Sequence, residues 1–352
     1  MLRRRLSKLY IFFSCFLLPL FPIAAAEDFA VLPAIDQTPY RLCISLIDFP
    51  TSTPENTFLL DSSGSRGTKT CPGLLSGYLV EDGYPLNQKG ESMAALFSDA
   101  VQVNCLFPER ADGWWLFDST QCFVTLQRDR FVLYRELGTV EKQNSSTTLD
   151  HGQFLPFNTI TSDVISDLHT NTYDALGNEL PDDDPRKGER LYAIPANEAN
   201  HYFGLTLDTA FTFPTQTDGG EDLIASFTAD DDLWVYIDGF LILDLGGIHS
   251  AIPGSINFST GAVTYRGADG KDYTTKLYKL FYNRYKGKYP EARERDVQAF
   301  LDDLFTENSH WQQVFKENTT HTIKLIYLER GAGASNLSIK MNLPILEKEA
   351  VE

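Results

Sequence analysis

The stretch TADDDLWVYIDGFLILDLGG, Thr228–Gly247, carries the clearest signal of the chain's architecture. Two apolar runs, 233–237 and 240–245, are joined by Asp238 and Gly239. An Asp-Gly pair between two strands is typical of a type I′ turn, because both central residues of that turn need a positive φ. The stretch therefore predicts an antiparallel hairpin, with three consecutive aspartates just before its first strand.

Strand patterns continue on both sides of this hairpin. Residues 41–49 and 202–213 read as strands, and Phe123–Tyr134 reads as two short strands around a polar turn. In Leu337–Leu343 apolar and polar residues alternate without a break, as in a half-buried antiparallel strand. We therefore predict an all-β fold, an antiparallel β-sandwich with loop and helical insertions.

Two other features are expected to interrupt the strands. Residues 55–70 and 140–152 are rich in Ser, Thr, Asn and Gly and are predicted to be loops. After Pro290, apolar residues recur with the spacing of an amphipathic helix that has proline in its first turn. The residues of this stripe are Val297, Phe300, Leu301, Leu304 and Phe305. We expect this helix to lie in an insertion at about 285–318 and to pack against its own domain.

The first 26 residues have the pattern of a secretory signal peptide. Four basic residues precede an apolar run at 11–23, and three alanines follow it, as at a cleavage site. No later segment is long and apolar enough to be a membrane helix. We expect residues 27–352 to form one domain, secreted or held at the cell surface by binding.

The chain is strongly acidic. Its formal net charge is −18, and removal of residues 1–26 would make it −22 because that segment has four basic residues and no acidic one. Such a surface repels nucleic acid and anionic lipid, so neither is expected as a partner. The charge is compatible with cation binding or with a neutral glycan, although solubility alone also accounts for it.

Four cysteines remain in the mature chain. An even number in an exported protein favours two disulfides, and the sequence leaves three connectivities open. The chain has no C-x-x-C pair, so we favour disulfides over a zinc site. The disulfide candidates are Cys43, Cys71, Cys105 and Cys122.

Asp230, Asp231 and Asp232 present an electrostatic problem if they are even partly buried. Neighbouring carboxylates repel one another, so at least one must take up a proton or bind a cation. Oxygen ligands and an extracellular setting favour Ca²⁺. An exposed turn with solvated charges is the alternative, and the composition does not decide between them.

The quoted stretch is part of a longer series of motifs. LIASFTADDDLWVYIDGFLILDLGGIHSAIPGSINF, followed by TIKLIYLERGAGASNLSIKM, resembles the fibro-slime domain, a member of the wider PA14 β-sandwich superfamily. The upstream pieces CISLIDFP, SGYLVEDGYPL and NHYFGLTLDTAFTF occur in a similar order. The resemblance spans roughly residues 42–343, and it is loose over residues 83–201.

This resemblance implies a site. In sugar-binding PA14 relatives, two successive aspartates joined by a cis peptide bond hold a calcium ion that also binds two hydroxyls of a terminal sugar. The matching residues are Asp230 and Asp231, and Asn336 occupies the place of a further ligand. Asp232 stands where the family often has glycine.

Two nearby residues are additional metal-binding or site-shaping candidates. Asp244 could bind metal, although an aspartate in a D-L-G-G motif more often caps a turn or accepts hydrogen bonds from main-chain amides. His249 could bind metal or hydrogen-bond to the same turn. Four N-x-[ST] sequons, at Asn144, Asn257, Asn318 and Asn336, are acceptors only in a host that glycosylates such sites.

The resemblance implies a calcium-dependent carbohydrate-binding, adhesin-like module that binds a glycan or an extracellular polysaccharide. The alternative is a non-catalytic matrix or slime protein in which calcium only stabilises a loop. The sequence lacks the H-E-x-x-H, G-x-S-x-G and Asp-Thr/Ser-Gly signatures of hydrolases. We therefore do not expect an enzyme.

Overall fold

The computed structural model describes fourteen parts of the chain. The predicted signal peptide, residues 1–26, lies outside them. The described residues are 42–49, 66–105, 113–120, 123–127, 130–134, 137–143, 146–158, 167–170, 179–184, 187, 190–195, 199–215, 220–331 and 334–346.

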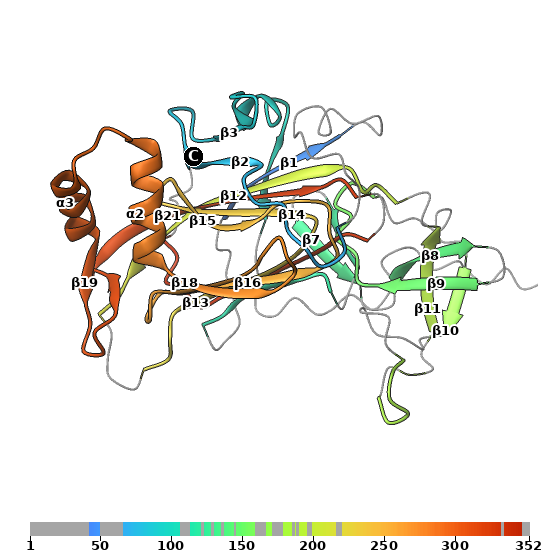
Figure 1. Ribbon diagram of the computed structural model, residues 1–352. Coiled ribbons are helices and arrows are strands. Elements are labelled where there is room, and N and C mark those ends of the chain that lie inside the picture. The colour runs from blue at the N-terminus through green and yellow to red at the C-terminus, as the bar shows by residue number, and fades with distance from the viewer. Residues whose placement is uncertain are drawn as a thin grey trace, which may run out of the picture.

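Two large antiparallel sheets form a sandwich (Figure 1). The eight-stranded sheet has the order β3 (Pro85–Asn87), β2 (Leu75–Leu79), β15 (Phe240–Leu245), β14 (Asp232–Ile237), β21 (Thr319–Glu329), β12 (Phe203–Phe213), β1 (Leu42–Asp48), β4 (Val101–Cys105). The six-stranded sheet has the order β18 (Asp272–Lys276), β17 (Ala262–Arg266), β16 (Ile252–Asn257), β13 (Ile224–Asp230), β22 (Asn336–Met341), β5 (Trp115–Asp118). The predicted all-β sandwich is confirmed.

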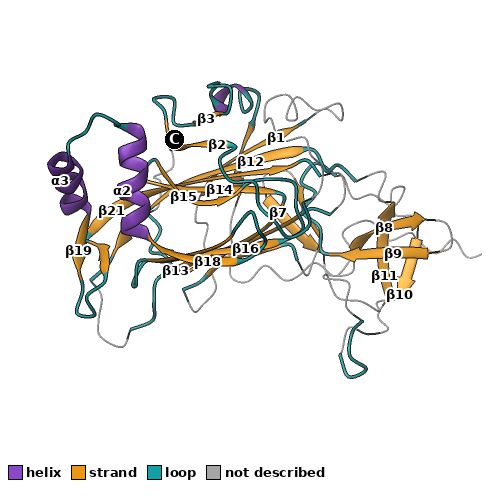
Figure 2. Cartoon of the chain, viewed as in Figure 1, coloured by secondary structure: helices purple, strands orange, loops and turns teal. Residues whose placement is uncertain are grey.

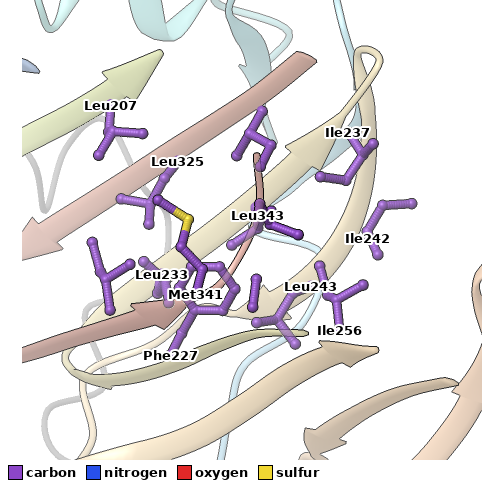
Figure 3. Close-up of a cluster of buried hydrophobic side chains, with 14 of the residues drawn as sticks. Leu207, Phe227, Leu233, Ile237, Ile242, Leu243, Ile256, Leu325, Met341 and Leu343 are labelled. Atoms are coloured by element: carbon purple, nitrogen blue, oxygen red, sulfur yellow. The ribbon is translucent and has the colours of Figure 1, made fainter. Parts of the chain in front are cut away.

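The main core lies between the two sheets (Figure 3). Leu233 and Leu325 project from the eight-stranded sheet toward Phe227 and Met341 of the six-stranded sheet, and all four are buried. The alternation predicted in Leu337–Leu343 follows from this packing, since Leu337, Ile339, Met341 and Leu343 are buried while Lys340 is exposed. Alternate residues of a strand face opposite sides of a sheet, so one side of β22 meets the core and the other meets solvent.

Strand β14 is buried on both faces. Leu233 and Val235 belong to the core between the sheets, whereas Trp234 and Tyr236 pack in a second apolar cluster on the outer face. Met93 of a short 3₁₀ helix, Met93–Ala95, is part of that second cluster. This double burial explains why the run in β14 is apolar throughout.

The hairpin predicted at Asp238 and Gly239 is confirmed. Strands β14 and β15 are antiparallel neighbours, and the two turn residues have φ of 48° and 76°. The two strands predicted in Phe123–Tyr134 are also present as β6 (Phe123–Gln127) and β7 (Arg130–Tyr134), which pair with each other.

The helical insertion differs from its predicted bounds. Helix α3, Glu294–Leu304, carries the predicted stripe, but it begins four residues after Pro290, and Phe305 starts a strand. A second helix, α2 (Leu277–Lys288), precedes it, and a small hairpin, β19 (Phe305–Glu307) with β20 (Gln313–Phe315), follows it. Both helices lie at one end of the sandwich (Figure 2).

The prediction of a loop at 140–152 is wrong. Strands β8 (Leu137–Gln143) and β9 (Ser146–His151) occupy most of this segment and form a four-stranded sheet with β10 (Asp167–Thr170) and β11 (Arg190–Pro195). The threonines of β9 have good β propensity although they are polar. Backbone pairing within this sheet therefore outweighed a polar composition that favoured a loop.

Candidate functional site

The aspartate triplet lies where the chain passes from one sheet to the other. Asp230 is the last residue of β13 in the six-stranded sheet, and Asp232 is the first residue of β14 in the eight-stranded sheet. The peptide bond between Asp230 and Asp231 is cis, as the resemblance implied. The three side chains are buried, with exposed fractions of 9%, 2% and 0%, so the alternative of an exposed, solvated turn is wrong.

Asp232 forms a buried ion pair with Arg330. The Arg330 guanidinium donates to both carboxylate oxygens, from Nε to Oδ2 and from Nη2 to Oδ1 at 3.2 Å. The main-chain amide of Gly247 also donates to Asp232 Oδ1. Both carboxylate oxygens of Asp232 thus accept hydrogen bonds from protein donors.

Asp231 is held by two main-chain amides. His249 N donates to its Oδ1 at 3.0 Å, and Arg330 N donates to its Oδ2 at 3.1 Å. Burial, followed by repulsion from Asp232, raises the pKa of Asp231 to about 7, although these two amides and the Arg330 charge act in the opposite direction.

The residue beside this carboxylate must be small. A Cβ on Gly331 would lie 2.6 Å from Asp231 Oδ2 and 3.0 Å from its Oδ1. Glycine therefore permits the chain after β21 to pass close to the carboxylate.

Glu329 joins this acidic cluster, and the sequence reasoning missed it. Its side chain is fully buried, Gly331 N donates to its Oε1 at 3.1 Å, and the Tyr327 hydroxyl donates to its Oε2 at 2.9 Å. Burial, followed by repulsion from Asp231 and then Asp230, raises the pKa of Glu329 well above its ordinary value. The sequence feature that could have predicted this role is the position of Glu329, an acidic residue at the end of the apolar run of β21.

The Tyr327 hydroxyl connects both sides of the cluster. Besides Glu329, it contacts the main-chain oxygen of Asp230, and it lies 3.2 Å from Ser335 Oγ. These contacts link the ends of β13 and β21 to the segment before β22. The tyrosine thereby fixes the relative positions of the residues that carry the carboxylates.

Asn336 lies directly opposite Asp230 in the pairing of β22 with β13. It is 8% exposed, and its amide nitrogen donates to Gly152 O at 2.9 Å and to Ser119 O at 3.2 Å. Gln153 Oε1 accepts a hydrogen bond from the neighbouring Ser335 N at 2.8 Å. Residues 152–153 therefore form one wall of the site, although they are far from it in sequence.

The side chains of Asp244 and His249 both contact main-chain groups. Asp244 accepts hydrogen bonds from Gly73 N at 2.9 Å and Gly246 N at 3.2 Å, as expected for a turn. Both ring nitrogens of His249 face main-chain carbonyls, with Nδ1 at 3.0 Å from Ser250 O and Nε2 at 2.9 Å from Leu245 O. The histidine therefore reaches Asp231 through its main-chain amide rather than through its ring.

The disulfide prediction remains a prediction. The side chains of Cys43, Cys105 and Cys122 lie outside the described residues. Cys71 is half-buried, and its main-chain amide donates to Gly246 O beside the site.

Among the described residues, no three His, Cys, Asp or Glu side chains form a group placed to hold a metal ion. The acidic cluster instead combines carboxylates with amide and main-chain oxygens. Across the same parts of the chain, none of the helices has the length and apolar character needed to cross a bilayer.

Comparison with known proteins gives relatives over part of the chain. No family model matches it. One solved structure, a β-glucosidase from Kluyveromyces marxianus in complex with glucose, aligns with 52% of this chain at 12% identity. The aligned part is 15% of the β-glucosidase chain. Its TM-score is 0.19, which is too low to support any inference.

Curated relatives from Dictyostelium discoideum share more sequence with the chain. Protein psiB is 32% identical over 136 residues, which is 39% of this chain and 22% of psiB. Protein psiE is 33% identical over 137 residues, 39% of this chain and 24% of psiE, and protein psiI is 34% identical over 112 residues, 32% of this chain and 14% of psiI. The chain thus spans less than a quarter of the length of these relatives, and the matches cover between about a third and two fifths of its own length.

Proposed function

We propose that this chain is a calcium-dependent carbohydrate-binding module that works outside the cell or at its surface. The supporting observation is the gathering of Asp230, Asp231 and Glu329 in a buried site where they repel one another. The nearby Arg330 guanidinium is paired with a fourth carboxylate, that of Asp232. Buried carboxylates in this number remain ionised only if a cation lies among them.

The chemistry of the site fits calcium. Calcium binds six to eight oxygen ligands in flexible geometry and accepts carboxylate, amide and main-chain carbonyl oxygens. Asp230, Asp231 and Asn336 would hold the ion, and Gly331 leaves room for the carboxylate of Asp231.

The Asn336 amide can contribute in a second way. In the orientation described above, its nitrogen donates to Gly152 O and Ser119 O. Turning the amide by half a rotation would place its oxygen beside these two carbonyls. Three oxygens facing one another repel, but together they suit a calcium ion.

A bound calcium ion would supply positive charge and coordination positions for two vicinal hydroxyls of a sugar. This assignment comes from the likeness to sugar-binding PA14 and fibro-slime domains. The net charge of −18 disfavours an anionic polysaccharide, so we propose a neutral glycan. Secretion follows from the pattern of residues 1–26, and we propose no catalytic activity.

The proposal can be tested with a glycan array. Wild-type protein is expected to retain glycans in calcium and to lose them in EDTA. Replacing Asp230 and Asp231 together by Ala is expected to abolish this retention while circular dichroism shows the same β structure. Glycan retention that EDTA leaves unchanged would rule out the proposed mechanism.

The burial of the cluster favours a second candidate function. Because Asp231 and Glu329 are 2% and 0% exposed, calcium could be enclosed by protein and only stabilise the crossing between the sheets. The chain would then be a structural matrix protein. A large rise in melting temperature on calcium addition, with no glycan bound in any screen, would favour this candidate.

A further inference from the structure

The structure distinguishes among the N-x-[ST] sequons of the chain. Attachment of a glycan requires the amide nitrogen of the asparagine, so that nitrogen must reach solvent in the folded, modified protein. Asn257, Asn318 and Asn336 fall within the described residues, whereas Asn144 does not.

Asn257 is unsuited to carry a glycan. It is half-buried in β16, its Nδ2 donates to Asp222 Oδ2 at 2.8 Å, and its Oδ1 accepts from Thr260 N at 3.0 Å. The last residue of its sequon, Ser259, accepts a hydrogen bond from Leu223 N at 2.9 Å. A glycan on this nitrogen would replace one of its two hydrogens beside Asp222 and would crowd the strand.

Asn336 is unsuited for a stronger reason. It is 8% exposed and lies opposite Asp230, with its amide nitrogen directed at Gly152 O and Ser119 O. A glycan on this nitrogen would have to displace the wall formed by residues 152–153. The folded structure therefore requires an unmodified Asn336.

Asn318 differs from these two asparagines in its exposure and in the contacts of its side-chain nitrogen. It is exposed and lies in the tight turn between β20 and β21 with φ of 60°, a left-handed conformation that asparagine adopts more readily than most residues. Its main-chain amide is fixed by Phe213 O at 2.7 Å, whereas its Nδ2 has a long contact of 3.4 Å with Thr215 Oγ1. Thr320, which completes the sequon, is also exposed.

We propose that Asn318 is an N-glycosylation acceptor and that Asn257 and Asn336 are not modified. In the transfer, Asn318 Nδ2 forms a bond to the anomeric carbon of an oligosaccharide carried on a lipid diphosphate. The bond between that carbon and the diphosphate oxygen breaks, the diphosphate leaves with the electron pair, and the amide loses one proton. In the natural host this step also depends on the proposed secretion.

The position of Asn318 keeps a glycan away from the acidic cluster. Asn318 immediately precedes Thr319, the first residue of β21, whereas Glu329 is the last. At about 3.3 Å per residue, the two ends of this strand are on the order of 30 Å apart. Modification at Asn318 is thus compatible with ligand binding at the cluster.

The test is site-resolved mass spectrometry of the full chain expressed in a eukaryotic cell line behind an established secretion signal. The added signal separates this test from the question of whether residues 1–26 direct secretion. Peptide N-glycosidase treatment in heavy-oxygen water is expected to mark Asn318 and to leave Asn257 and Asn336 unmarked. Peptide mapping also keeps any signal from Asn144 separate.

Two variants of Thr320 provide the matched control. Thr320→Ala destroys the sequon without changing the asparagine and is expected to remove one glycan from the protein, whereas Thr320→Ser preserves both sequon and glycan. An unmodified Asn318 in the wild-type protein, or substantial modification of Asn336 or Asn257, would overturn the proposal.

Discussion

Arg330 and Asp232 form an ion pair in which both side chains are fully buried, although they are 98 positions apart in the sequence. The pair joins the start of β14 to the residue that follows β21. A buried pair is costly to break, because removal of one partner leaves the other charge without compensation. The pair therefore holds the crossing between the sheets in place.

Replacing Arg330 by Met is expected to lower the free energy of unfolding by about 3–5 kcal/mol, because the Asp232 carboxylate would be left unpaired. The double variant Asp232→Asn, Arg330→Met should lose less of the free energy of unfolding than Arg330→Met alone, because it has no uncompensated buried charge. Urea denaturation in EDTA measures both. The exposed pair of Arg293 and Asp296 provides the control, because Arg293→Met should cost less than about 1 kcal/mol. Additive losses in the double variant would contradict the assigned role of the pair.

Glu329→Gln is expected to change the free energy of unfolding by less than about 1 kcal/mol at pH 7 in EDTA. Burial and the nearby carboxylates raise the pKa of Glu329 well above its ordinary value, which favours the neutral side chain when no cation is bound, and glutamine is neutral and of the same size. Glu329→Ala should lose roughly 1–3 kcal/mol, because it removes both hydrogen bonds of this buried side chain, although the Tyr327 hydroxyl keeps its contacts with Asp230 O and Ser335 Oγ. A loss of several kcal/mol in the glutamine variant would show that the carboxylate is ionised.

Gly331→Ala is expected to weaken calcium binding and to destabilise the protein by about 1–3 kcal/mol, because the new Cβ would overlap the Asp231 carboxylate. Calcium titration calorimetry and urea denaturation measure the two effects. Gly287 of helix α2 is the matched control, since a Cβ there meets no atom within 4 Å. Gly287→Ala should stabilise the protein by roughly 0.5–1 kcal/mol. Calcium affinity unchanged in Gly331→Ala would place the ion elsewhere.

His201 should make stability fall in acid. Burial lowers its pKa from 6.5 to about 4, and its Nε2 has no hydrogen-bond partner among the described residues. Between pH 6.5 and 4 the unfolded chain binds a proton that the folded protein does not, so this contribution to stability is complete above pH 6.5 and disappears as the pH falls through this range. The free energy of unfolding of wild type minus that of His201→Gln should drop by about 3 kcal/mol between pH 7 and pH 4. A difference independent of pH would contradict this assignment.

Local patterns predicted the strands and turns well. The Asp238-Gly239 hairpin follows from the positive φ that its turn requires, and the alternation of Leu337–Leu343 follows from a strand with one buried face. The resemblance to PA14 domains anticipated the cis bond between Asp230 and Asp231. These features depend on neighbouring residues or on a continuous motif.

Helix α2 was harder to predict because its pattern is weakly amphipathic and rich in aromatic residues. Its position depends on contacts distant in sequence, such as the packing of Phe281 against Phe240 and Phe315. The strands at 137–151 were missed for a related reason. Their polar composition favoured a loop, whereas backbone pairing with each other and with a strand 55 residues away made them strands.

The sequence by itself determined the all-β class, the hairpin and the position of three adjacent aspartates in a compact motif. Only the tertiary structure decided what each aspartate does. It placed the end of β21 beside the start of β14, so that Arg330 neutralises Asp232 while Glu329 adds a further buried carboxylate to Asp230 and Asp231. The physical reason is that burial and charge pairing depend on distances in space, and residues nearly 100 positions apart become neighbours only when the sheets form.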